Sequence, residues 1–202
     1  MPGVQILSRK MGAMLRPFRL WLARRREQAE FAKHWRSTRG SDLVRTISTM
    51  ALMELNSPIL ERPCSSLSVS DARLLRNAYA VALIWIVNSV VVPDHTKEVG
   101  NTIVSAVLTN LKTWPHFDGA LTKKMSDGAP AVLSRMWERS APSLLSPNGI
   151  VSPAAHIALL PGSVGLPFSA PFVPDPRMAI ETLHSLSAFR DSLPRNAPAR
   201  HK

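Results

Sequence analysis

The chain has a single cysteine, Cys64, among its 202 residues, so a disulfide within one copy is excluded. It also has no Asn-x-Ser/Thr site for N-glycosylation. These two absences are typical of proteins that stay in a reducing compartment, and we therefore expect an intracellular protein, in the cytoplasm or the nucleus. The N-terminus lacks the continuous apolar core of a secretory signal, because arginine and lysine residues interrupt each apolar stretch there.

Motifs for catalysis or metal binding are also missing. The six histidines show no HExxH, CxxC or His-x₃-His spacing, so we expect no metal and no other cofactor. The sequence has no phosphate-binding glycine loop and no GxSxG elbow. Asp94 precedes His95, but a helix cap explains Asp94 more simply than an acid–base pair. Cys64 has no identifiable base beside it, so we predict a protein that is not an enzyme.

Positive charge is concentrated in one terminal segment. The formal net charge is +11, and residues 9–39 contain ten lysines and arginines against two glutamates, which places +8 of that charge in this segment. A field of this kind favours an anionic partner. The residues predicted to contact it are Arg16, Arg19, Arg24, Arg25, Arg26, Lys33, Arg36 and Arg39.

Aromatic side chains interleave with these cations, and Trp21, Phe31 and Trp35 are candidates for stacking or for an interface. The pattern fits phosphate contacts with base stacking, insertion into an anionic membrane surface, or capture by an acidic protein groove. It also fits a solvated helix whose tryptophans pack on the rest of the chain. We predict a basic amphipathic helical arm over residues 1–40 that binds nucleic acid or a nucleoprotein.

Helical periodicity follows from residue 41 to about residue 140, and it predicts an all-α bundle. Apolar residues recur at helical spacing over residues 42–56 and again over residues 99–114. Pro58 and Pro63 are expected to break the chain, with a serine-rich loop up to a cap at Ser70. Further helices are expected from residue 71, over residues 118–125 and from Pro130 onward. The bundle would act as a scaffold or as the unit of a homo-oligomer.

The most apolar stretch is AYAVALIWIVNSVVV, residues 78–92. A membrane-spanning helix needs about 20 predominantly apolar residues, whereas the interval between Arg76 and Asp94 is shorter and contains Asn88. A helix that is apolar on every face also fits the centre of a soluble bundle. We predict the buried core helix, in which Asn88 would need a polar partner. A membrane-inserted hairpin formed by residues 78–114 stays open as the alternative.

The composition changes after residue 141. Ten of the 17 prolines lie between Pro142 and Pro198, which predicts a Pro-rich, largely irregular extension over residues 141–202. One short helix is expected within it, near residues 176–193, capped by Asp175 and able to dock on the bundle or bind a partner.

Four helical segments resemble a known protein family. LVRTISTMALMELNSP (43–58), RLLRNAYAVALIWIVNSVVVP (73–93), VSAVLTNL (104–111) and APAVLSRMW (129–137) are distantly similar, in this order, to the helical half of paramyxovirus C-type accessory proteins. The resemblance covers less than half of the chain. It implies a small, basic, non-enzymatic accessory protein that binds viral polymerase components and host signalling proteins. A regulatory protein-interaction module is therefore the alternative function.

Overall fold

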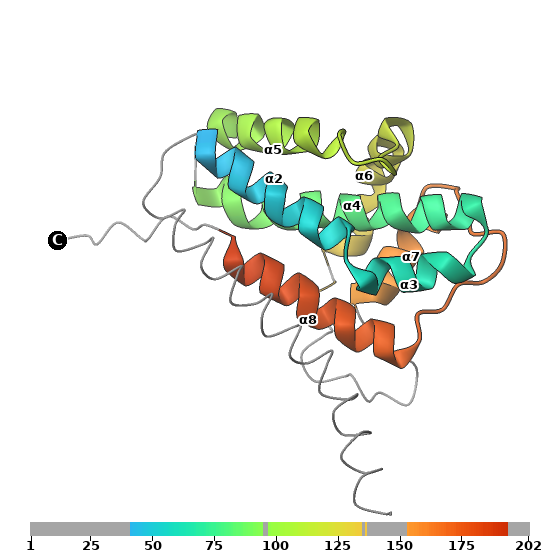
Figure 1. The fold of residues 1–202 in the computed structure, drawn as a ribbon. Helices are drawn as coiled ribbons and strands as arrows, with labels where there is room; N and C mark the ends of the chain where they lie inside the picture. Colours follow the sequence, from blue (N-terminus) through green and yellow to red (C-terminus); the bar gives the residue numbers. More distant parts are fainter. Residues whose placement is uncertain (1–40, 95–96, 135, 137–152, 194–202) are drawn as a thin grey trace, which may run out of the picture.

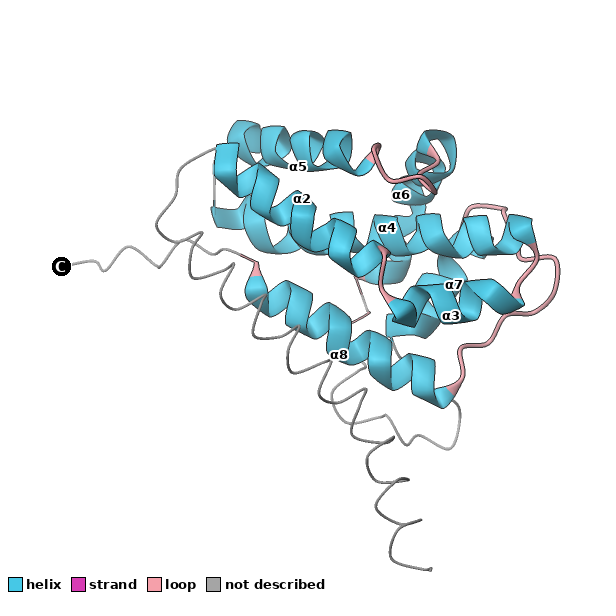
Figure 2. Cartoon of the chain, in the orientation of Figure 1, coloured by secondary structure: helices cyan, strands magenta, loops and turns pink. Residues whose placement is uncertain are grey.

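The computed structural model describes residues 41–94, 97–134, 136 and 153–193, which we call the body. The body is all-α, and no strand occurs among its residues (Figures 1 and 2). The predicted all-α helical bundle is therefore confirmed. Its helices are α2 (Ser41–Leu55), α3 (Pro58–Ser66), α4 (Val69–Val91), the 3₁₀ turn η1 (Val92–Asp94), α5 (Lys97–Leu111), α6 (Gly119–Leu133), α7 (Pro153–Ser163) and α8 (Pro176–Ser192).

Helix α4 lies at the centre of the body and contacts α2, α3, α5, α6, α7 and α8. Residues 78–83 are buried without interruption. Because six residues make more than one helical turn, this part of α4 is enclosed on every side. The packing fits the predicted core helix. By length and composition α4 also qualifies as a membrane span, with 61% of its most apolar window buried, so the hairpin stays open as an alternative.

Side chains that accept hydrogen bonds from free backbone N–H groups set the starts of several helices. Ser57 Oγ accepts from the N–H of Ile59 at the start of α3 (3.2 Å). Ser68 caps α4 by accepting from the N–H of Asp71 (3.1 Å). The cap of α4 therefore lies two residues before the predicted Ser70.

Prolines occur inside helices where the sequence predicts breaks. Pro63 lies within α3, so residues 58–66 form a helix where breaks at Pro58 and Pro63 were expected, and of the expected serine-rich loop over residues 64–70 only Leu67 and Ser68 lie outside a helix. Pro130 lies within α6, which runs as one helix where two elements were expected. Leu60 and Cys64 bury one side of α3 in the core, and this burial offsets the hydrogen bond that Pro63 cannot donate.

Helices α7 and α8 belong to the same hydrophobic core as α2 and α4, where an irregular extension was expected. Ile157 and Leu160 of α7 are buried in that core, as are Leu186 and Phe189 of α8. Helix α8 agrees with the predicted short helix, and α7 was not predicted. The segment 164–175 joins them without helical structure, and we call it the strap. Gly165, the second residue of the strap, has a φ of 72°, a left-handed conformation that suits glycine.

Candidate functional site

The residues predicted to bind an anionic partner all lie outside the described part of the chain, so their role stays a prediction. They are Arg16, Arg19, Arg24, Arg25, Arg26, Lys33, Arg36 and Arg39, together with the aromatic residues Trp21, Phe31 and Trp35. The structure instead shows the body that follows this segment, beginning at Ser41. The net charge and the polar contacts of the body are described below, because the body is the part of the protein to which the basic segment is attached.

The body is close to neutral. It contains ten lysines and arginines against eleven aspartates and glutamates, a formal net charge of −1. The excess positive charge of the protein therefore lies entirely outside the body. The basic segment is therefore attached to a body whose net charge is close to zero.

Several cations of the body are bound within it. Glu181 of α8 accepts from Arg62 Nη1 of α3 and from Arg177 Nε of its own helix, each at 2.9 Å. One carboxylate thus joins α3 to α8. The pair lies at the surface, where solvent weakens such contacts.

A second ion pair joins α3 to α4. Arg76 donates Nε to Glu61 Oε1 at 3.2 Å and Nη2 to Glu61 Oε2 at 2.8 Å, which makes the contact bidentate. The hydrogen bond from Arg76 lowers the pKa of Glu61, and the same bond raises the pKa of Arg76. Arg76 is mostly buried, with 17% of its side chain exposed, so its charge is committed to this contact.

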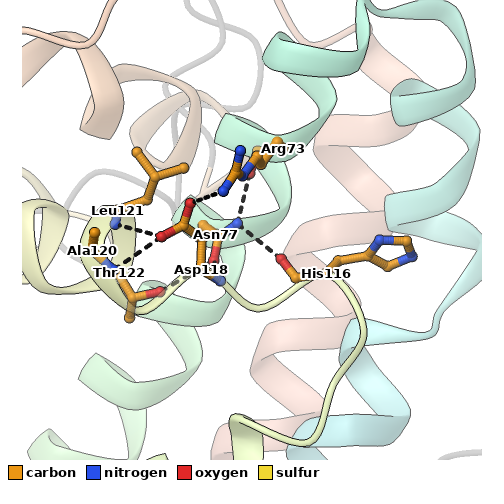
Figure 3. A network of polar contacts seen from close by, with 7 residues as sticks. All are labelled: Arg73, Asn77, His116, Asp118, Ala120, Leu121 and Thr122. Carbon is orange, nitrogen blue, oxygen red and sulfur yellow. Dashed lines mark hydrogen bonds and ion pairs between the residues drawn. The ribbon is translucent and has the colours of Figure 1, made fainter.

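A buried amide holds the junction of α4, α6 and the loop between α5 and α6 (Figure 3). The Nδ2 group of Asn77 donates to the carbonyls of Arg73 (2.8 Å) and His116 (3.1 Å). Its Oδ1 atom accepts from the N–H of Asp118 (2.8 Å) and from Thr122 Oγ1 (3.2 Å). Both ends of the amide are therefore used, as a buried polar group requires.

Asp118 begins α6 beside this amide. Its Oδ1 accepts from the N–H groups of Ala120 (2.9 Å) and Leu121 (3.1 Å), and its Oδ2 contacts Arg73 Nη2 at 2.5 Å (Figure 3). The hydrogen bond from Leu121 is the main reason that the pKa of Asp118 is lowered, and the charge of Arg73 adds to it. The arrangement fixes where α6 starts relative to α4. The imidazole of His116 points away from it.

The prediction that Asn88 needs a polar partner in a bundle does not apply, because Asn88 is exposed. The amide that is enclosed is Asn77, which lies just before the apolar stretch. The sequence signal is that Asn77 directly precedes the apolar residues 78–87 on the same expected helix. This signal does not identify the distant partners His116, Asp118 and Thr122, which lie 39 to 45 residues away.

Two buried carboxylates bind serines from distant parts of the chain. Glu54 of α2 accepts a hydrogen bond from Ser185 Oγ of α8. Asp71 of α4 accepts from the N–H of Ser169 (2.9 Å) and from its hydroxyl group, which attaches the strap to α4. The hydrogen bonds from Ser169 lower the pKa of Asp71. Each carboxylate holds one C-terminal segment against the body.

Cys64 lies on α3 in the core, where a loop position was expected. Burial raises its pKa to about 11, so the thiol is neutral at physiological pH and is a poor nucleophile. Within the body, no three His, Cys, Asp or Glu side chains gather in a way that would hold a metal ion.

Comparison with known proteins gives no match. No protein-family model, no curated protein and no solved structure is similar to this chain at a significant level.

Proposed function

We propose that this protein is a non-catalytic binding protein whose basic segment, residues 9–39, binds nucleic acid or a nucleoprotein. The body serves as the scaffold that carries the segment. One observation supports this most directly: the segment has a charge of +8, whereas the body has a charge of −1 and binds several of its own cations internally. A positive field concentrated in one segment directs an anionic partner to that segment.

The chemistry of the segment favours nucleic acid among anionic partners. Ten cations over residues 9–39 supply phosphate contacts, and their binding would release counterions from the nucleic acid. Trp21, Phe31 and Trp35 supply flat faces for base stacking, which does not depend on base sequence. Binding is therefore expected to be strongly salt-dependent and weakly sequence-dependent.

The test is the salt dependence of binding to a single-stranded RNA of mixed sequence. The variant Arg24→Gln/Arg25→Gln/Arg26→Gln in the full chain should lower affinity and reduce the slope of log K against log salt by about 0.7 for each phosphate that the variant no longer neutralises. The matched control is Lys112→Gln/Lys123→Gln/Lys124→Gln, which removes three exposed cations of the body. Equal reductions of affinity in the two triple variants would contradict the proposal.

Two other functions compete with this one. A membrane hairpin of residues 78–114 is favoured by the length and apolar composition of α4. In that case the full chain would float with phosphatidylserine vesicles and stay bound after a high-salt wash. A regulatory protein-interaction module would show neither RNA nor vesicle binding.

The expected location inside the cell, in the cytoplasm or the nucleus, belongs to the same proposal. The proposal also includes the role of the body as an oligomerisation unit. Light scattering of the full chain during size-exclusion chromatography measures the oligomeric state directly. A mass of one chain at all concentrations would contradict it.

A further inference from the structure

Ser169 holds the strap against α4, although Ser169 itself is exposed. Its N–H donates to Asp71 Oδ1 at 2.9 Å, and its hydroxyl donates to Oδ2 of the same carboxylate. Asp71 is only 5% exposed. Ser185, whose hydroxyl binds Glu54, is buried at that contact. Of these two serines, only Ser169 can therefore be reached by an enzyme that modifies hydroxyl groups.

The residues around Ser169 form neither helix nor strand. The strap runs from residue 164 to residue 175, and Figure 2 shows it as a loop at the end of the body where α4 starts. In contrast, the exposed serines Ser105 and Ser126 lie inside α5 and α6. A protein kinase binds the residues on both sides of its target in an extended form, which a helix prevents. Ser169 thus combines exposure with a backbone that suits such an enzyme.

A phosphate on Ser169 would replace a hydrogen bond with a repulsion. The hydrogen bonds from Ser169 lower the pKa of Asp71, so its carboxylate is charged at neutral pH. A phosphoserine carries about −1.5 to −2 charges at this pH, and its oxygens accept hydrogen bonds. Next to a carboxylate, a phosphate acts through like-charge repulsion and desolvation, both of which are unfavourable. The closed position of the strap would therefore lose its main polar contact.

The two arginines in the first half of α4 are already bound by other carboxylates. Arg73 contacts Asp118 Oδ2 at 2.5 Å, and Arg76 holds Glu61 in a bidentate contact. The start of a helix also attracts anions, but its partial charge is only about half an elementary charge. This is smaller than the negative charge that a phosphate adds beside Asp71, so repulsion is expected to outweigh the attraction.

We propose that Ser169 is a phosphorylation site and that its phosphorylation releases the strap from α4. A serine/threonine kinase would transfer the γ-phosphoryl group of a nucleoside triphosphate to Ser169 Oγ. A P–O bond forms at Oγ, the bond between the γ-phosphorus and the bridging oxygen breaks, the nucleoside diphosphate leaves, and the hydroxyl proton passes to a base of the kinase. Release uncovers Phe168 and Phe172, which pack against the core with ring centroids 5.4 Å apart. This switch is separate from the basic segment and does not depend on its function.

Hydrogen exchange of the full chain measures the release. Ser169→Glu places a negative charge beside Asp71, and we expect the strap amides to exchange at least about tenfold faster than in the parent. Ser169→Ala removes the hydroxyl but keeps the N–H, so its effect should be smaller. Val173→Glu is the matched control, because it adds the same charge at a position of the strap that is 82% exposed. Its exchange should equal that of the parent, and all three variants should keep the helical circular dichroism.

The double variant Asp71→Asn/Ser169→Glu separates repulsion from lost packing. The asparagine removes the charge that the glutamate meets, so exchange in the strap should return to that of Asp71→Asn alone. The proposal is overturned if Asp71→Asn does not reduce the effect of Ser169→Glu. It is also overturned if Ser169→Ala or Val173→Glu releases the strap as far as Ser169→Glu does.

The modification itself is measured by mass spectrometry after the full chain is incubated with ATP and a panel of purified serine/threonine kinases. We expect phosphate on Ser169, together with the faster strap exchange seen for Ser169→Glu. Absence of phosphate from Ser169 overturns the proposal. A chain that is phosphorylated at Ser169 and keeps the strap exchange of the parent overturns it as well.

Discussion

The first half of α4, residues 69–77, carries polar side chains that each bind a different part of the body. Asp71 binds the strap, Arg73 binds the cap of α6, and Arg76 binds α3. Asn77 binds the loop before α6 and α6 itself. In the second half, residues 78–91, the buried side chains are aliphatic apart from Tyr79. The two halves therefore hold the body by different physical means.

This difference separates stability from orientation. Burial of aliphatic side chains is favourable in proportion to area and has no preferred direction. Hydrogen bonds and bidentate ion pairs require particular positions of both partners. We infer that the second half of α4 stabilises the body mainly through apolar burial, while the first half fixes how α3, α6 and the strap are placed around it.

The largest effect is expected in the apolar half. Leu83 is completely buried, so Leu83→Ala should lower the free energy of unfolding by about 2–5 kcal/mol, because it removes buried apolar surface and leaves a cavity. Urea denaturation followed by circular dichroism measures it. The control is Asn88→Ala at an exposed position of the same half, which should change stability by less than about 0.5 kcal/mol. A similar destabilisation in both variants would contradict the central position of this half.

The next effect is expected at the buried amide. Asn77→Leu keeps the volume but leaves the carbonyl of His116 and the N–H of Asp118 without their partner. We expect a destabilisation of about 2–3 kcal/mol, since each buried group without a partner costs about 1–3 kcal/mol. Hydrogen exchange should also speed up at Asp118 more than in α2. If Asn77→Leu is as stable as the parent, the amide does not hold the junction.

A smaller effect is expected at the ion pair between α4 and α3. Arg76→Gln removes the bidentate contact to Glu61, and we expect a destabilisation of about 1 kcal/mol or less because Glu61 is partly exposed. The difference from the parent should shrink in 0.5 M salt, as about 0.1–0.2 M already screens exposed charges. Thermal unfolding at two salt concentrations tests this. Arg45→Gln on the exposed side of α2 is the control.

The smallest effect is expected at Asp71, whose contribution is present at neutral pH and is lost on acidification. The folded-state pKa of Asp71 is lowered below its unfolded value by the hydrogen bonds from Ser169. Its contribution is therefore complete above the unfolded pKa, about 4, and is lost as pH falls through the lower folded pKa. Asp71→Asn should flatten the fall of stability below about pH 4. Denaturation curves that keep the parent's acid dependence would show that Asp71 does not hold the strap through its charge.

Much of the fold follows from local sequence signals. Residues 42–56 show helical spacing, and α2 is found at Ser41–Leu55. Asp175 followed by Pro176 predicts a capped helix, and α8 begins there. In both cases the cap or the periodicity lies within a few residues of the helix that it predicts.

The helices that sequence reasoning missed depend on distant contacts. Pro63 and Pro161 predict breaks, because proline lacks the N–H that a helix needs. Helices α3 and α7 form nonetheless, since Cys64 and Ile157 are buried against α4 and its neighbours. Propensity is a local quantity, and tertiary burial overrides it.

The polar contacts of α4 also bear on the order in which the protein folds. Asn77 reaches partners 39 to 45 residues later, and Asp71 reaches one 98 residues later. Hydrogen bonds at such separations form only after long loops have closed, and that closure costs chain entropy first. Helices α3 and α5 are the neighbours of α4 along the chain, so their contacts with α4 close shorter loops. The hydrogen bonds of Asn77 and Asp71 can form only when these distant partners have reached their final positions. We therefore expect these bonds to form late in folding.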